Sequence, residues 1–135
     1  LHLLPGPGET VGAALVADPR VAGIVFTGGT ETARAINRGL AAREGPIATL
    51  IAETGGLNAM IVDSSALPEQ VVGDALLSAF NSAGQRCSAL RILCLQDEIA
   101  DRTLRMLAGA MQELRVGDPA RIETDLGPVI DAEAL

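Results

Sequence analysis

Apolar runs of strand length alternate along the chain with segments of helical periodicity. Strands are predicted over residues 21–26, 47–52, 58–62 and 91–95, and helices over 10–17, 30–42, 68–80 and 98–114. The clearest helix starts at Pro68, and its apolar positions recur about every four residues from Val71 to Phe80. Because helices that alternate with short buried strands are typical of an α/β fold, we expect parallel sheet elements with helices on both faces.

One junction departs from this alternation. At Gly55-Gly56 two strand-like runs meet with no helix between them. A parallel βαβ unit needs a crossover helix, so we expect the chain to pass from one sheet to another at this point. The predicted division is into residues 1–55 and 56–135.

Composition excludes several classes of protein. The 135 residues suffice for one domain and are too few for two ordinary ones, and a hydrophobic share of 48% excludes a disordered segment. All ten basic residues are arginine, so the chain alone lacks the lysine of a P-loop or a Schiff-base enzyme. The net charge of -7 argues against nucleic-acid binding. No apolar run reaches the ~18 residues of a membrane helix. We therefore expect neither a nucleic-acid partner nor a membrane partner from this segment.

Histidine and cysteine are scarce. His2 is the only histidine, and Cys87 and Cys94 are the only cysteines. These are too few for a zinc site or a disulfide framework, so we expect no metal and a reducing, cytoplasmic compartment.

The chain begins at Leu1 without Met and stops at Leu135 soon after a new apolar stretch. We interpret it as an internal piece of a longer protein.

Two glycine-rich turns are candidates for binding a cofactor phosphate. The first includes Gly8 and resembles a dinucleotide fingerprint, but its third glycine comes one residue late. The second, at Gly28, Gly29 and Thr30, joins a predicted strand directly to a helix, whose free N–H groups and dipole attract anions. For both turns the alternative is an ordinary tight turn that opens a helix.

Glu53 and Cys87 are the candidates for acid–base and nucleophilic chemistry. Glu53 follows the predicted strand 47–52, and desolvation there would make its carboxylate a stronger base; the alternative is an exposed loop glutamate. Cys87 lies among small residues after the long helix, and the neighbouring Arg86 would favour the nucleophilic thiolate; the alternative is a buried structural thiol. Cys94, inside an apolar run, is predicted to be a small core residue.

The helper of a nucleophilic Cys87 must be a carboxylate. A papain-like thiol hydrolase uses a histidine base, and the single histidine lies at the start of the chain with no orienting partner.

Four motifs then resemble one family. Phe26-Thr-Gly-Gly-Thr-Glu31, Glu53-Thr-Gly-Gly-Leu-Asn58, Gly84-Gln-Arg-Cys87 and Asp125-Leu-Gly-Pro-Val-Ile130 occur in this order, and Cys87 follows Glu53 by 34 residues. In order and spacing they resemble the aldehyde dehydrogenase superfamily over nearly the whole chain. The stretch 51–91 is most similar to the Δ1-pyrroline-5-carboxylate (glutamate semialdehyde) dehydrogenase half of bifunctional proline-utilisation flavoproteins.

The resemblance implies an NAD-dependent oxidoreductase that converts L-glutamate γ-semialdehyde to glutamate in proline catabolism. Cys87 would attack the aldehyde carbon to give a thiohemiacetal and then a thioester, and its backbone N–H would form half of an oxyanion hole. Glu53 would activate the water that releases the product. Further residues would contact the cofactor (Gly8, Gly28, Gly29, Thr30, Thr54 and Gly55) or the substrate (Arg86 and Ser88).

The resemblance also assigns the two predicted parts. Residues 1–55 would be the C-terminal part of a Rossmann-like NAD-binding domain, and residues 56–135 the N-terminal part of the cysteine-bearing catalytic domain. FAD would belong only to the proline dehydrogenase half, which is absent from this segment. The parent protein is expected to be a homo-oligomer.

The chain departs from the family pattern at two positions and lacks several family parts. Gly29 stands where the family usually has a phosphate-binding serine, and Leu57 replaces a common lysine. The family's oxyanion-hole asparagine, ribose-binding lysine and nicotinamide-positioning glutamate fall outside the chain. We therefore expect the isolated segment to be inactive. The alternatives are an aldehyde dehydrogenase for another small aldehyde, and a folded segment with only a structural or assembly role.

Overall fold

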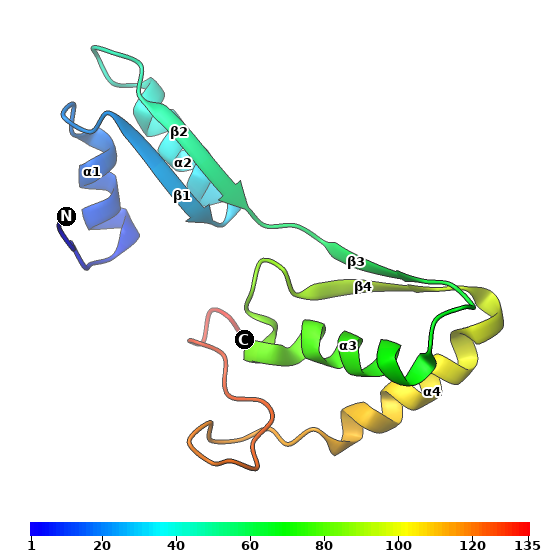
Figure 1. Ribbon diagram of the computed structural model, residues 1–135. Helices are drawn as coiled ribbons and strands as arrows, with labels where there is room; N and C mark the ends of the chain where they lie inside the picture. The colour runs from blue at the N-terminus through cyan, green and yellow to red at the C-terminus, as the bar shows by residue number, and fades with distance from the viewer. The chain divides into compact units, whose positions relative to one another are not determined.

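A computed structural model describes all residues, 1–135. The chain forms two compact units, Leu1–Gly55 and Gly56–Leu135, which are described separately below. Each unit has two strands and two α-helices, which are labelled in Figure 1. The α/β class with parallel strands is confirmed, and no helix is both long enough and apolar enough to cross a membrane.

The first unit is a parallel strand pair with its crossover helix. Its elements are a π-helical turn at Gly8–Gly12, α1 (Ala13–Ala17), β1 (Gly23–Gly28), α2 (Thr30–Ala41) and β2 (Thr49–Thr54). β1 pairs with β2 from Gly23 opposite Thr49 to Gly28 opposite Thr54. Both strands therefore end at the same edge of the sheet, immediately beside the start of α2.

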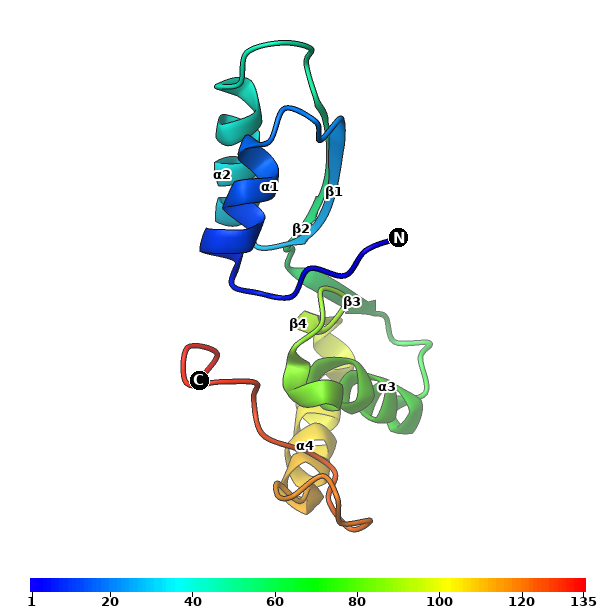
Figure 2. The same cartoon turned by 90° about the vertical axis from the view of Figure 1, so that its left-hand side faces the viewer.

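Helices cover only one face of this sheet. Figure 2 shows α1 and α2 on the same side of β1 and β2. On the opposite face Val25 and Ile51, which are partners in the register, are 80% and 56% exposed. Cover on both faces is therefore not present within this chain. A right-handed βαβ unit places its one crossover helix on one face, and covering the other face takes further elements.

Arg43 joins the segment after α2 to the segment between α1 and β1. It follows α2, and its guanidinium donates hydrogen bonds to the carbonyls of Val16 (3.4 Å), Pro19 (3.3 Å) and Val21 (2.9 Å). These carbonyls belong to the end of α1 and the link to β1, which would otherwise need other donors.

We expect the Arg43→Ala substitution to lower the free energy of unfolding of the first unit by about 2 kcal/mol, because three carbonyls lose a charged donor. Urea unfolding, monitored by the hydrogen exchange of residues 13–28, measures the change in the free energy of unfolding. Arg34→Ala is the matched control, since Arg34 is exposed on α2 and makes no hydrogen bond or ion pair. Equal stabilities for the two variants would contradict the role given to Arg43.

The second unit repeats the strand–helix–strand plan and adds a helix. Its elements are β3 (Asn58–Val62), α3 (Pro68–Phe80), a 3₁₀ turn at Asn81–Gly84, β4 (Leu90–Leu95) and α4 (Asp97–Glu113). β3 and β4 are parallel, with an irregularity in register between Asn58 and Ala59. The two sheets are separate, so the chain does pass from one to another between β2 and β3, as the missing helix predicts.

The core of the second unit lies between the sheet and α3, with α4 packed against α3. Its buried side chains are Val62, Val71, Val72, Ala75, Ala89 and Thr103. The opposite face of the sheet is uncovered: Ile61 is 84% exposed, and its register partner Cys94 is exposed too. The prediction of Cys94 as a core residue is therefore wrong for this chain, because an apolar strand pattern does not show which of its faces is covered.

Candidate active site

The carboxyl edge of the first sheet brings two predicted segments together. Gly28, the last residue of β1, is the register partner of Thr54, the last residue of β2, and Glu53 is the partner of Thr27. Gly29 then caps α2, and Gly55 follows β2. In open α/β sheets, ligands bind at this edge of the strands.

The start of α2 presents unpaired backbone donors at that edge. The first bond of the helix runs from Ala33 N to the carbonyl of Gly29 (3.1 Å), so the N–H groups of residues 30–32 have no helical partner. A Cβ at Gly29 would meet nothing within 4 Å, whereas one at Gly28 would lie 2.5 Å from the Phe26 ring. Packing of Phe26 therefore explains Gly28, while the fold places no demand on Gly29.

Gly8 lies in a turn that opens a helix, as its motif predicts, whereas Glu53 departs from its predicted setting. Gly8 opens the π-helical turn, and a Cβ there would meet nothing within 4 Å. Glu53 lies inside β2 rather than after it, on the uncovered face of the sheet, and it is exposed. The expected desolvation of its carboxylate is therefore absent within this unit, because no element covers that face.

Cys87 occupies an exposed turn between α3 and β4. Ala89 N donates to the Arg86 carbonyl at 3.1 Å, so Cys87 and Ser88 are the two central residues of the turn. The alternative of a buried thiol does not hold for this chain. The side chains of Arg86 and Ser88 are exposed and make no hydrogen bonds, which leaves both free to meet a ligand.

A rare backbone conformation leads into this turn. Ser82 and Ala83 have φ values of 57° and 54°, and Gly84 follows with φ 68°. Non-glycine residues seldom adopt the left-handed region, and such positions concentrate at functional sites. The left-handed run ends the helical path of α3 and redirects the chain toward Cys87.

Three side chains tie this segment to the rest of the second unit. Asn58 donates to the carbonyls of Cys87 (2.6 Å) and Ala89 (3.0 Å), and Arg91 donates to the carbonyl of Gly84 (2.6 Å). Gln85 accepts a hydrogen bond from Ile130 N at 2.8 Å, which joins the third motif of the sequence to the fourth. None of these roles is predicted from the sequence. The available signals were a polar residue opening β3 and an arginine inside an apolar strand.

Alanine at Gly84 tests the strain of this segment. The new Cβ would lie 2.8 Å from the Ala79 carbonyl oxygen at a left-handed residue, so we expect Gly84→Ala to lower the free energy of unfolding by about 2 kcal/mol. Gly73→Ala is the control: Gly73 lies within α3 with open space around it, and alanine there is expected to stabilise by about 0.5–1 kcal/mol. Thermal unfolding of both variants measures the two effects, and Tm shifts of the same sign would contradict this prediction.

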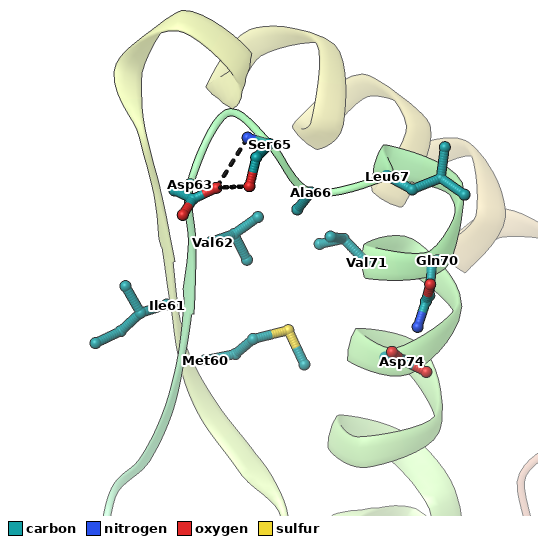
Figure 3. Close-up of a pocket in the computed structure, with 10 residues that line it drawn as sticks. All are labelled: Met60, Ile61, Val62, Asp63, Ser65, Ala66, Leu67, Gln70, Val71 and Asp74. Atoms are coloured by element: carbon teal, nitrogen blue, oxygen red, sulfur yellow. Dashed lines mark hydrogen bonds between the residues drawn. The ribbon is translucent and has the colours of Figure 1, made fainter.

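A cavity of about 440 Å³ lies elsewhere, between β3, the loop that follows it and the first half of α3. Figure 3 shows Met60, Val62 and Val71 pointing into it. Asp63 accepts hydrogen bonds from the backbone N–H and the hydroxyl of Ser65. The Ser65 hydroxyl, followed by its backbone N–H, lowers the pKa of Asp63. Cys87 does not line this cavity. No group of three or more His, Cys, Asp or Glu residues could hold a metal ion.

Comparison with known proteins identifies the class. The sequence model of the aldehyde dehydrogenase family matches residues 1–135, so the chain belongs to this family. It is 66% identical to the bifunctional protein PutA of Escherichia coli strain K12 over 99% of this chain and 10% of that protein. It is 37% identical to the 1-pyrroline-5-carboxylate dehydrogenase of Geobacillus kaustophilus over 99% of this chain and 27% of that protein.

Solved structures agree with this class. A mutant of Bradyrhizobium japonicum proline utilization A (PutA) matches with a TM-score of 0.91 and 62% identity, over 95% of this chain and 13% of that one. A 1-pyrroline-5-carboxylate dehydrogenase from Thermus with bound NAD matches with a TM-score of 0.88 and 37% identity, over 96% and 26%. The chain thus spans about a tenth of the length of the PutA proteins that it matches.

Proposed function

We propose that the protein carrying this chain is an NAD-dependent dehydrogenase that oxidises L-glutamate γ-semialdehyde to glutamate in proline catabolism. The observation that carries the proposal is the exposed Cys87 in a turn whose backbone is held on both sides by hydrogen bonds. The names of the similar PutA and 1-pyrroline-5-carboxylate dehydrogenase proteins support the choice of substrate.

In this proposal Cys87 is the nucleophile. Its thiolate attacks the aldehyde carbon and forms a C–S bond, and the carbonyl oxygen becomes an oxyanion. The Cys87 N–H makes no hydrogen bond within its unit, which leaves it available as a donor to that oxyanion. Arg86 and Ser88 flank the thiol with free polar side chains, and they would contact the carboxylate of the substrate.

Glu53 is the proposed general base for the second half of the reaction. Its carboxylate takes a proton from a water molecule as that water attacks the thioester carbon. The C–S bond then breaks, and glutamate leaves while Cys87 recovers its thiolate. The position of Glu53 at the carboxyl edge of β2, with Thr54 and Gly55 following, supports this role.

The residues at the carboxyl edge of the first sheet fit a dinucleotide. The unpaired N–H groups at the start of α2 suit a pyrophosphate, and the open space at Gly29 allows close approach of the backbone. Gly28, Gly29 and Thr30 would hold the phosphates, Thr54 and Gly55 the nicotinamide side, and Gly8 the adenine side. NAD, when bound, would accept the hydride that leaves the substrate carbon. Residues 1–55 and 56–135 would belong to the cofactor-binding and catalytic domains.

The test is NADH formation by the full-length protein with glutamate semialdehyde and, in parallel, with other small aldehydes. We expect kcat/KM to be highest for the semialdehyde. A higher value for another aldehyde would favour the alternative substrate, and no NADH with any aldehyde would overturn the proposal. The 135-residue chain alone is expected to be inactive, because half of the oxyanion hole and most cofactor contacts lie outside it.

A further inference from the structure

We propose that Asn58 is a positioning residue that sets the orientation of the nucleophile Cys87. The inference rests on the proposed function, since it gives Asn58 a role in the reaction assigned to Cys87. Asn58 lies at the first position of β3, 29 residues away from Cys87 in the sequence, and its carboxamide reaches the Cys87 turn.

The carboxamide of Asn58 donates both of its N–H groups to carbonyls of this turn. Nδ2 lies 2.6 Å from the Cys87 carbonyl oxygen and 3.0 Å from the Ala89 carbonyl oxygen. Both partners are acceptors, so only the amino end of the carboxamide can face them. The orientation of the side chain is therefore fixed by chemistry as well as by its position.

These bonds complete the hold on the backbone of Cys87. On the N-terminal side, the Arg86 carbonyl accepts from Ala89 N at 3.1 Å, which fixes the peptide before Cys87. On the C-terminal side, Asn58 fixes the peptide after it. With both peptide planes set, the directions of the Cys87 N–H and of its Cα–Cβ bond are set too. Ala89, only 1% exposed, anchors the turn on its inner side.

The turn needs an external donor because its own backbone supplies none to the Cys87 carbonyl. The preceding residues Ser82 and Ala83 are in the left-handed region, and the Cys87 carbonyl has no partner other than Asn58. Without the carboxamide this carbonyl could rotate and bring its negative end toward Sγ, which disfavours the thiolate. Asn58 would thus set both the direction of the Cys87 thiol and its reactivity as a nucleophile.

A positioning role and a merely structural role predict different kinetics. Loss of folding alone lowers the fraction of active protein and leaves kcat per active site and KM unchanged. Loss of positioning lowers kcat per site, because a displaced nucleophile attacks more slowly. The KM for NAD should stay constant, since the proposed cofactor contacts come from residues 1–55.

The experiment compares Asn58→Ala and Asn58→Asp with the wild type in the full-length protein. We expect kcat per folded site to fall about 10- to 100-fold in Asn58→Ala, with the KM for NAD within about twofold. Asn58→Asp keeps the shape of the side chain but presents oxygens to two carbonyls, so its kcat should fall at least as far. Asn81→Ala is the matched control, since Asn81 is exposed at the start of the same segment and its side chain makes no hydrogen bond; its kcat should be unchanged.

Alkylation by iodoacetamide, mapped by mass spectrometry, keeps this test independent of the dehydrogenase proposal. We expect alkylation of Cys87 to slow by at least about threefold in Asn58→Ala, with Cys94 as an unchanged internal reference. A wild type that oxidises no aldehyde would overturn the proposed reaction, while slowed alkylation would still support the hold of Asn58 on Cys87. Unchanged Cys87 alkylation and unchanged kcat per site in a folded Asn58→Ala protein would overturn the positioning role.

Discussion

Replacing Cys87 with alanine in the full-length protein is expected to lower kcat/KM for aldehyde oxidation by about 10³-fold or more. Alanine cannot form the C–S bond, so no thiohemiacetal can form and no hydride can leave the substrate carbon. Because the proposed cofactor contacts lie in residues 1–55, the affinity for NADH should be unchanged. Steady-state kinetics and a fluorescence titration with NADH measure the two quantities separately.

Cys94 provides the control for this prediction. It is the other cysteine of the chain and is also exposed, but it lies within β4 on the uncovered face of the sheet. Cys94→Ala should therefore keep kcat within about twofold of the wild type, as expected for a surface substitution. Activity retained in Cys87→Ala, or lost equally in both variants, would show that the thiol of Cys87 is not the nucleophile.

The fold class and most elements could be predicted from the sequence because apolar periodicity reports burial. The helix from Pro68 ends at Phe80 as expected, and Val71, Val72 and Ala75 on its apolar stripe are buried. The strand 58–62 also has the predicted bounds. In the helix the side chains that define the period are the ones that pack, whereas in the strand only Val62 is buried and Ile61 is exposed.

The first two strands lie two residues later than the apolar runs predict. β1 covers Gly23–Gly28 and β2 covers Thr49–Thr54, so the pairing continues through Thr27, Gly28, Glu53 and Thr54. Backbone hydrogen bonds sustain a ladder past the last apolar side chain, and polar residues at a sheet edge carry no period. The same shift moves Glu53 from a loop into a strand.

The support around Cys87 could not be predicted, because it depends on contacts between distant residues. Asn58 and Arg91 meet the 84–89 segment only after the strands pair, and neither shows in a local pattern. Left-handed conformations at Ser82 and Ala83 are also hidden from sequence rules, which assign them to glycine and asparagine. Local sequence thus predicts the location of a candidate nucleophile, but it does not predict the hydrogen bonds that hold the backbone around it.

Replacing Glu53 with glutamine is expected to block the reaction at a different point from Cys87→Ala. Glutamine has nearly the same shape as glutamate but cannot accept a proton from water, so hydrolysis of the thioester should slow by about 10²- to 10⁴-fold. Attack by Cys87 does not need this base once the thiolate has formed. Each active site should therefore release one equivalent of NADH quickly and then stall, with the acyl group still attached to Cys87.

Rapid-mixing kinetics and intact-protein mass spectrometry would show the burst and the acylated enzyme together. Glu44→Gln is the matched control, since Glu44 is exposed in the loop after α2 and makes no hydrogen bond; its steady-state rate should equal that of the wild type. If Glu53→Gln gave no burst, the carboxylate would be needed before hydride transfer, which would make it the base that activates Cys87. If it turned over at the wild-type rate, water would be activated by a group outside this chain, and Glu53 would be no more than an exposed residue of β2.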